Sequence, residues 1–168
     1  ENSEIDRQVL ESMLPPLEHL LRNAVAHGIE TPVARQQRKK PDAGKISLGI
    51  RRDGSEVIIE VADDGGGLDL AAIRRKAYEK GLIAENHRLT DEQAVEMILR
   101  PGFSTASELT QAAGRGVGMD VVDNEVKKLG GSMQIESTAG RGSRFLIRLP
   151  YTLAITHALI VNVGDETF

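Results

Sequence analysis

Apolar residues near the start of the chain recur at the spacing of two consecutive amphipathic helices. Within residues 4–14 the apolar positions are Ile5, Val9, Leu10, Met13 and Leu14. Because proline lacks the backbone donor and clashes with the preceding turn, Pro15-Pro16 predicts that the first helix ends there. A second helix is expected to begin at once and to stop at Gly28.

The second helix is expected to have one apolar and one polar face. At about 100° per residue, one broad arc collects Leu17, Leu20, Leu21, Ala24 and Val25. His19, Asn23 and His27 follow one another at steps of four on the opposite side. Taken alone, two such histidines are more often solvated or locally hydrogen-bonded than ligands. The arc therefore predicts the core face, and the polar triplet needs further evidence.

Apolar alternation further along the chain predicts two β-hairpins. The expected strands are residues 45–52, 55–63, 132–138 and 143–150. Asp53-Gly54 between the first two is a strong hairpin signal, and the glycine-bearing turn 139–142 separates the last two. Each pair is therefore expected to be antiparallel.

Helical periodicity returns between the two hairpins. Helices are expected over residues 70–82, 90–99 and 117–130, with Thr90 as an N-cap and Gly130-Gly131 as a stop. Residues 100–116 are rich in Gly, Ser, Thr and Ala without periodicity, which is typical of a long functional or disordered loop.

The order of these elements predicts the fold class. Strands come in pairs without regular alternation of strand and helix, which favours an α+β two-layer sandwich. We expect helices on one face of a mainly antiparallel mixed sheet. Residues 1–152 are expected to form this domain, and the apolar, β-like residues 153–168 the start of a following one.

Composition narrows the class of function. Aromatic residues make up 3% of the 168 residues, and the net charge is −4, so neither a base-stacking surface nor a basic nucleic-acid or membrane footprint is expected. There are no cysteines, which excludes disulfides, zinc-thiolate sites and thiol catalysis. The apolar stretches are shorter than the roughly 18 residues of a membrane span, and the polar start lacks the features of a signal peptide. These features predict a soluble, cytoplasmic domain.

Two glycine-rich segments suggest close backbone approach to a ligand. "DDGGGLD" (63–69) follows a predicted strand, and "GRGVGMD" (114–120) precedes a predicted helix. Backbone donors at such places bind phosphate, so a nucleotide site is the first hypothesis. Neither a P-loop nor the G-x-G-x-x-G dinucleotide fingerprint occurs. Each segment alone could be no more than a turn.

Taken together in their order, the motifs resemble a known superfamily. "HLLRNAVAHGIE", "DDGGGLD", "PGFST", "GRGVGMD" and "GRGSRFLIRLP" resemble the nucleotide-binding boxes of the GHKL ATPases, which have the Bergerat fold. The wording "HGIE", "GRGVGMDVV" and "LPYTLAI" is similar to the kinase domain of CheA-type chemotaxis histidine kinases, and within them to the surface-motility (Pil-Chp) branch. The resemblance covers about residues 3 to 155.

This resemblance assigns the helix triplet to ATP chemistry. It implies that Asn23 coordinates a magnesium ion that bridges the phosphates, a role suited to a hard, neutral amide oxygen. His19 stands where many GHKL ATPases have a water-activating Glu, which would favour phosphate transfer over hydrolysis. His27 would reach the same phosphates, and Arg22 and Lys76 are weaker candidates for phosphate contact.

The resemblance also assigns the glycine boxes. Asp63 would accept a hydrogen bond from the adenine amino group, with Gly65 and Gly67 turning the chain beneath the base. Gly114, Arg115, Gly116 and Gly118 would wrap the phosphates at the hinge of a lid over residues 100–116. The same comparison implies that Phe103 seats the lid and that Ser143 stands where a Thr commonly faces the nucleotide. Leu99 and Ala26 depart from the family pattern, in place of a second lid Phe and of an Asp.

In CheA-type kinases the γ-phosphate passes to a His on a separate phosphotransfer domain and then to a response regulator. None of His19, His27, His87 and His157 lies in a recognisable acceptor helix, so this stretch is expected to bind ATP without phosphorylating itself. A CheW-like coupling protein and a chemoreceptor array are the further partners implied, and residues 153–168 would begin a CheW-like domain. The alternatives are a GHKL conformational clamp, which would require a Glu at position 19, and a non-catalytic ATP-sensing module.

Overall fold

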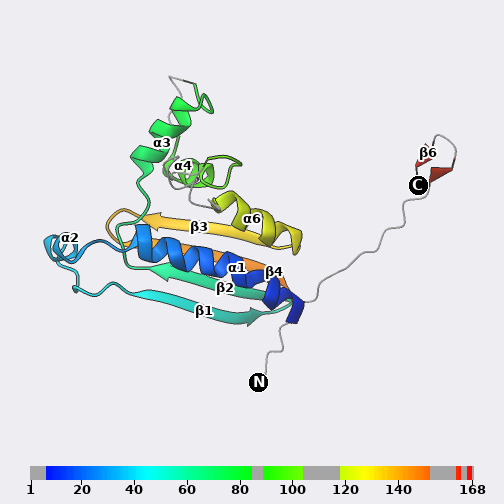
Figure 1. Ribbon diagram of the computed structural model, residues 1–168, viewed down its shortest axis with the longest axis horizontal. Coiled ribbons are helices and arrows are strands. Elements are labelled where there is room, and N and C mark those ends of the chain that lie inside the picture. The colour runs from blue at the N-terminus through cyan, green and yellow to red at the C-terminus, as the bar shows by residue number, and fades with distance from the viewer. Residues whose placement is uncertain (1–6, 85–88, 104–117, 152–161, 164–165, 168) are drawn as a thin grey trace.

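The computed structural model describes residues 7–84, 89–103, 118–151, 162–163 and 166–167 (Figure 1). The helices are α1 (Arg7–Asn23), the π-helix η1 (Ala24–Gly28), α2 (Pro32–Gln37), α3 (Leu70–Glu79), α4 (Asp91–Met97) and α6 (Met119–Lys128). The strands are β1 (Ile46–Asp53), β2 (Glu56–Asp63), β3 (Ser132–Thr138), β4 (Gly142–Pro150), β5 (Asn162–Val163) and β6 (Glu166–Thr167).

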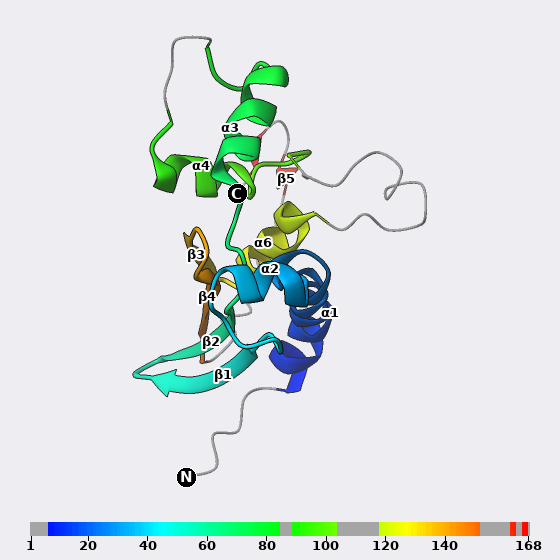
Figure 2. The same ribbon diagram turned by 90° about the vertical axis from the view of Figure 1, so that its left-hand side faces the viewer.

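Four strands form one sheet in the order β1-β2-β4-β3. Both predicted hairpins are confirmed: β1 pairs with β2 across the Asp53-Glu56 step, and β3 pairs with β4. Figures 1 and 2 show α1 and α6 on the same face of this sheet. The α+β two-layer architecture is therefore confirmed. The expected mixed sheet is not found, because every pairing among the described strands is antiparallel.

The main core fills the space between the sheet and the helices α1 and α6. Every second residue of β2 and β4 faces this layer, as a pleated strand requires. The buried residues are Val9, Met13, Leu17 and Leu20 of α1, Val57, Ile59 and Val61 of β2, Phe145, Ile147 and Leu149 of β4, and Val122 and Val126 of α6. Burial of these aliphatic side chains holds both helices against the sheet.

A second cluster joins α3, α4 and the segment that follows α4. Its buried residues are Ile73, Ala77, Leu89, Ala94, Met97, Ile98 and Phe103. The predicted N-cap of α4 is confirmed: Thr90 Oγ1 accepts from Gln93 N–H (3.2 Å), and Gln93 Oε1 accepts from Thr90 N–H (3.0 Å). Met119 and Ile135 pack against both clusters, which ties the α3–α4 unit to the main layer.

Helix α1 runs through Pro15-Pro16, so the prediction of a helix end at these prolines is wrong. A proline pair removes two N–H donors, but it leaves the side-chain periodicity of the helix intact. Val9 and Met13 before the pair, and Leu17 after it, are buried on one continuous stripe. Packing of this stripe on the sheet outweighs the local cost of the prolines.

The last turn of the predicted second helix is a π-helix, in which Ile29 N–H donates to Ala24 O (2.8 Å). This wider turn changes which side chains face the sheet. Ala24 is buried as expected, but Val25 is 66% exposed, so its predicted place on the core arc is wrong. The predicted stop at Gly28 is confirmed, since the π-helix ends there.

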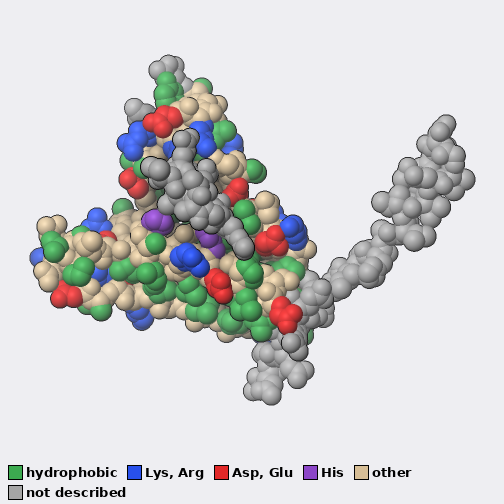
Figure 3. Space-filling view, in the orientation of Figure 1, with side chains coloured by type: hydrophobic (Ala, Val, Ile, Leu, Met, Phe, Trp, Pro, Cys, Tyr) green, Lys and Arg blue, Asp and Glu red, His purple; other side chains and the backbone are tan. Residues whose placement is uncertain are grey.

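Strand β1 forms an edge of the sheet that α1 leaves partly uncovered. Leu48 and Ile50 of β1 are 49% and 47% exposed, and Leu10 and Leu14 of α1 are 40% and 50% exposed. Figure 3 shows hydrophobic side chains gathered along this border of α1 and β1. No helix within the described residues has both the length and the apolar character needed to cross a membrane. The predicted domain boundary at residue 152 stays a prediction.

Replacing Pro15 tests the continuity of α1. Pro15 is exposed, so Pro15→Ala is expected to restore a helical N–H and remove the ring clash without disturbing the core. We expect an increase of about 2 kcal/mol in the free energy of unfolding, measured by urea denaturation. Pro101→Ala, at an exposed turn after α4, is the matched control and should give no increase. Equal effects of the two substitutions would contradict a continuous helix.

Candidate functional site

Three polar residues lie in a row at one end of the sheet, on its helix-covered face. Val61 pairs with Phe145 and Ala62 with Arg144, so the next step of the same register places Asp63 opposite Ser143. Ser143 pairs in turn with Ser137 of β3. Because Val61 and Phe145 face the core, residues two positions further along their strands face the same side.

The backbone at the end of η1 is in direct contact with the backbone that follows β2, with no side chains between them. Gly66 N–H donates to Gly28 O (2.9 Å), and a Cβ on Gly65 would lie 1.9 Å from the same oxygen. A Cβ on Gly28 would lie 3.2 Å from the Asp63 carboxylate. The Gly65 separation leaves no room for a side chain, so this glycine allows the α1–η1 helix to approach the acidic end of β2.

The other side of the glycine loop is fixed to the β3–β4 turn. Gly67 has a φ of +77°, and a Cβ there would lie 2.6 Å from Thr138 O. Leu68 N–H donates to Ser137 Oγ (2.8 Å), which lies 3.2 Å from Ser143 Oγ. Ser143 therefore lies in this end row, while its predicted place facing a nucleotide stays a prediction. Ser137 is a neighbour that no sequence motif indicated.

The Asp63 carboxylate is oriented by the loop that it begins. Its Oδ1 accepts from Gly65 N–H at 2.9 Å. Within the described part of the chain, Oδ2 has no hydrogen-bond partner, and the residue is only partly buried. Asp63 can therefore accept a further hydrogen bond from a ligand without loss of its own anchor.

His19 and Asn23 form a hydrogen-bonded pair on α1. Asn23 Nδ2 lies 2.9 Å from His19 Nε2. Since the amide nitrogen can only donate, the imidazole must accept at Nε2 and be neutral with its proton on Nδ1. Burial lowers the pKa of His19, and the charge of Arg22 lowers it further, which agrees with a neutral ring.

This pairing also fixes the Asn23 amide. With its nitrogen turned to His19, its Oδ1 has no hydrogen-bond partner among the described residues. A fixed amide oxygen without a partner, half-buried at the start of η1, fits a hard cation or a water on one. His27 lies one turn later in η1 and is exposed. Figure 3 shows the two described histidines on the same face of the molecule.

The remaining predicted residues lie on other elements. Lys76 is in α3, one of the two helices that contribute to the second cluster. Phe103 is fully buried in that cluster. Its predicted role in seating the lid stays a prediction. Gly118 is the N-cap of α6. Gly114, Arg115 and Gly116 lie outside the described residues.

Two contacts hold Gly102, which belongs to the first residues of the predicted lid. Gly102 N–H donates to Asp120 Oδ2 on α6 (3.2 Å), and Lys80 Nζ at the end of α3 donates to Gly102 O. Phe103 N–H closes the turn by donating to Arg100 O (3.0 Å). The chain therefore enters residues 104–117 from a point fixed to both α3 and α6.

Sequence reasoning missed a buried guanidinium beneath the glycine loop. Residues 31–44 contain α2, and Arg35 on it is fully buried. Its guanidinium donates to both carboxylate oxygens of Asp64 (3.1 and 2.9 Å), to Glu30 (3.2 Å) and to the carbonyls of Pro41 and Ala43. Asp64 is therefore an anchor for the glycine loop.

Lys40 completes this anchor, which we call the Arg35 network. Its Nζ donates to Asp64 O and Gly65 O, both at 2.7 Å, and to Glu30 Oε1 at 2.9 Å. The hydrogen bond from Arg35 holds the pKa of Asp64 below its usual range, so the carboxylate is ionised at neutral pH. The polar, basic stretch around Arg35 carries no local pattern that indicates the burial of one arginine.

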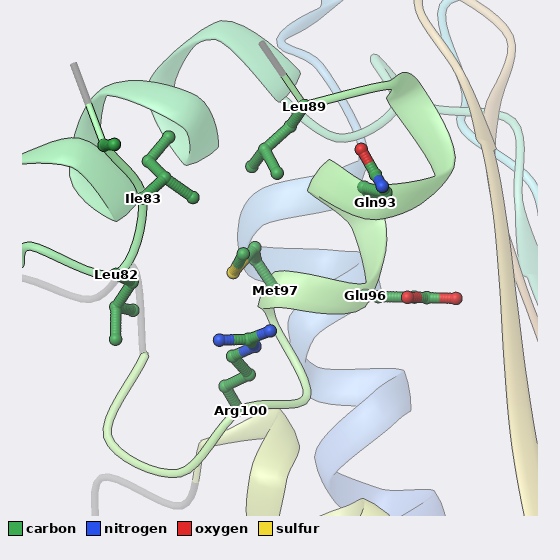
Figure 4. Close-up of a pocket in the computed structure, with 8 residues that line it drawn as sticks. Leu82, Ile83, Leu89, Gln93, Glu96, Met97 and Arg100 are labelled. Carbon is green, nitrogen blue, oxygen red and sulfur yellow. The ribbon is translucent and has the colours of Figure 1, made fainter. Parts of the chain in front are cut away.

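A separate cavity of about 430 Å³ lies beside α4 and is drawn in Figure 4. Apolar side chains of Leu82, Ile83, Leu89 and Met97 line it together with polar residues of α4. None of the predicted site residues lies in this lining, so the cavity is distinct from the sheet end that carries Asp63.

Residues 14–153 match the family of histidine kinase-, DNA gyrase B-, and HSP90-like ATPases (HATPase_c). The chain is 46% identical to the chemotaxis protein CheA of Bacillus subtilis, over 99% of this chain and 25% of that protein. It is 45% identical to the gliding motility regulatory protein of Myxococcus xanthus, over 100% of this chain and 22% of that protein. Among solved structures, a blue-light activated histidine kinase of Erythrobacter litoralis is similar at 15% identity and a TM-score of 0.47, over 86% of this chain and 31% of that one. The chain thus spans about a quarter of the length of these curated relatives.

Removing Arg35 tests whether the network supports the loop. Arg35→Met would leave the Asp64 and Glu30 carboxylates without their buried partner, which is costly in a poorly solvated site. We expect the melting temperature to fall by about 10 °C in a calorimetric scan. Arg38→Met is the matched control, since Arg38 is half-exposed and bonds only to Glu30 among the described side chains. An equal, small effect of both changes would show that the network is not an anchor.

Proposed function

The chain belongs to the family of histidine kinase-, DNA gyrase B-, and HSP90-like ATPases, and on that basis we propose that it is the ATP-binding catalytic domain of a CheA-like protein histidine kinase. The curated relatives named above are chemotaxis and gliding-motility proteins, which favours the kinase branch over the others. The observation that supports the proposal is the backbone contact between Gly28, at the end of the helix that carries Asn23, and the glycine loop that begins at Asp63.

Asp63 is proposed to select the adenine base. Its Oδ2 is available beside the backbone of Gly28, and its Oδ1 is held by Gly65 N–H. A carboxylate oxygen accepts a hydrogen bond from the adenine amino group, whereas guanine presents a carbonyl oxygen at that position. Ser143, opposite Asp63 in the register, would face the same ligand from the next strand.

Asn23 is proposed to be the protein ligand for a magnesium ion bound with the phosphates. The partnerless Oδ1 described above is the observation that fits this role, because magnesium takes few protein oxygens and leans on substrate phosphates. When bound, the ion would supply charge neutralisation at the phosphates. His27, Arg22 and Lys76 are proposed to contact the phosphates at their edges.

His19 is proposed to spare ATP from hydrolysis. A water-activating base needs a lone pair directed at the water, but the Nε2 lone pair of His19 already accepts from Asn23. Its other ring nitrogen carries the proton. The residue therefore orients Asn23 and offers a poor base, which leaves the γ-phosphate for transfer to a protein acceptor.

The phosphates are proposed to lie at the N-terminus of α6. Gly118 caps this ten-residue helix without a side-chain hydrogen bond, so its first N–H groups point outward. Gly114, Arg115 and Gly116 would complete the phosphate loop, and Phe103 would seat it through the second cluster. Closure of this loop over a complete nucleotide would exclude water before transfer.

Transfer to a separate phosphotransfer domain, with a response regulator downstream, is proposed for the whole protein of which this domain is a part. A CheW-like coupling protein, a chemoreceptor array and a cytoplasmic location belong to the same proposal. Catalysis would be mostly positioning, because an in-line transfer needs the acceptor imidazole, the phosphate and the leaving group held in one line.

A transfer assay tests the proposal. The chain, magnesium and radiolabelled ATP are mixed with a purified phosphotransfer domain of a CheA-like kinase, and label on the acceptor His is measured. We expect labelling, and a loss of about 100-fold in Asn23→Ala, because that variant lacks the positioned oxygen. Asn124→Ala, the same change at an exposed site on α6, should label normally.

The other outcomes identify the alternatives. ATP binding without label on the acceptor would favour an ATP-sensing module, and ATP hydrolysis without label would favour a conformational clamp. Normal labelling by Asn23→Ala would show that the metal ligand is misplaced.

A further inference from the structure

The outer edge of β3 borders a groove that the proposed ATP site does not use. β3 pairs only with β4 among the described strands, so its other edge is open for backbone hydrogen bonds. The groove has a volume of about 470 Å³ and lies between this edge and α4. Figures 1 and 2 place α4 next to β3, away from α1.

The floor of this α4–β3 groove is apolar. Val95 and Leu99 line it from the α4 side, and Met133 and Ile135 line it from β3. The two β3 residues are separated by one position, so both point to the helix side while Gln134 points away. The floor therefore has the period-two spacing that an extended peptide presents.

The rim of the groove is acidic. Asp91, Glu92 and Glu96 line it on α4, and Glu136 lines it on β3, with no lysine or arginine in the lining. Figure 4 shows Glu96 projecting from α4 on the side away from Leu82 and Ile83.

Not all of this charge is neutralised within the molecule. Asp91 is paired with Arg74, and Glu136 lies 3.2 Å from Arg144, which also binds Glu60. Glu92 and Glu96 form no ion pair with any described residue, and both are exposed. A net negative rim over an apolar floor favours a cationic occupant.

The opposite edge of the sheet differs in charge. β1 carries the exposed residues Arg51 and Arg52, and Lys45 lies directly before it. Basic side chains on an edge strand oppose pairing with another basic segment. The two open edges therefore discriminate between partners, and only the β3 edge suits a cationic one.

We propose that the α4–β3 groove is a docking site for an extended, basic segment of a partner protein, which adds to β3 as a fifth strand. Its main-chain groups pair with the open edge, and its alternate apolar side chains lie against Val95 and Leu99. Its lysine or arginine side chains reach the carboxylates of Glu92 and Glu96. Docking of this kind does not require ATP.

Because the groove ends beside the glycine loop, a segment docked in the groove can affect that loop. At the end of the groove, Ser137 Oγ accepts from Leu68 N–H, and Thr138 O lies against Gly67. At the other end of the groove, the chain continues from Leu99 to Gly102, whose backbone is hydrogen-bonded to Asp120 and Lys80. This consequence rests on the proposed function, whereas the docking itself does not.

A peptide titration tests the docking. The probe is a capped, fluorescently labelled eight-residue peptide of alternating lysine and valine, and binding is followed by anisotropy. We expect saturable binding that weakens at least tenfold in the double variant Glu92→Gln/Glu96→Gln. The matched control is Glu18→Gln/Glu79→Gln, which removes the same charge from exposed sites on α1 and α3 and should bind normally.

Backbone readout distinguishes strand addition from charge attraction. Bound peptide should slow amide hydrogen exchange in residues 132–138 and leave exchange in β1 unchanged. Equal weakening in both double variants, or slowed exchange only outside β3, would overturn the proposal. Sedimentation that shows a dimer lost in the groove variant, with no competition by the peptide, would assign the groove to a second copy and would also overturn it.

Discussion

Close approach of backbone to backbone at the sheet end is the constraint on which the site depends. Gly28 O and the Gly65 position are so near that no side chain can separate them, and Gly142 stands in the same relation to Asp63 O, where a Cβ would lie at 1.9 Å. These contacts bring a helix, a strand and a hairpin turn to one point. Without them, the Asn23 amide and the Asp63 carboxylate would belong to separate surfaces.

The adjacent residues Asp63 and Asp64 have different roles because their carboxylates have different hydrogen-bond partners. Asp64 is engaged by Arg35 and by Lys45 N–H (2.8 Å), so it holds the loop and is not available to a ligand. Asp63 keeps one oxygen without a partner because the loop satisfies only the other. The buried guanidinium of Arg35 holds Asp64 and thereby the loop. The loop in turn holds the neighbouring Asp63, whose second carboxylate oxygen is available to a ligand.

Local signals predicted the parts of this fold that local chemistry decides. Asp53-Gly54 and the capping residue Thr90 specify their turn and helix start through their own backbone and side-chain geometry, and both predictions are confirmed. Pro15-Pro16 misled because burial on the sheet, a long-range effect, outweighs a local penalty. Arg35 was missed for the same reason, since only the folded chain brings Asp64 and Glu30 around it. In the site, residue types and order indicated Asn23 and Asp63, but not the hydrogen bond that joins Asn23 Nδ2 to His19 Nε2.

Chemical-shift mapping is the measurement that tests most directly whether these segments form one nucleotide site. Backbone and side-chain amide signals of the isotopically labelled chain would be followed during titration with magnesium and ATP. The account predicts saturable shifts with one common affinity at Asn23, Gly28, Gly65 and Ser143, because all four surround the same ligand. Shifts confined to the cavity beside α4, or different affinities at the helix and at the sheet end, would contradict it.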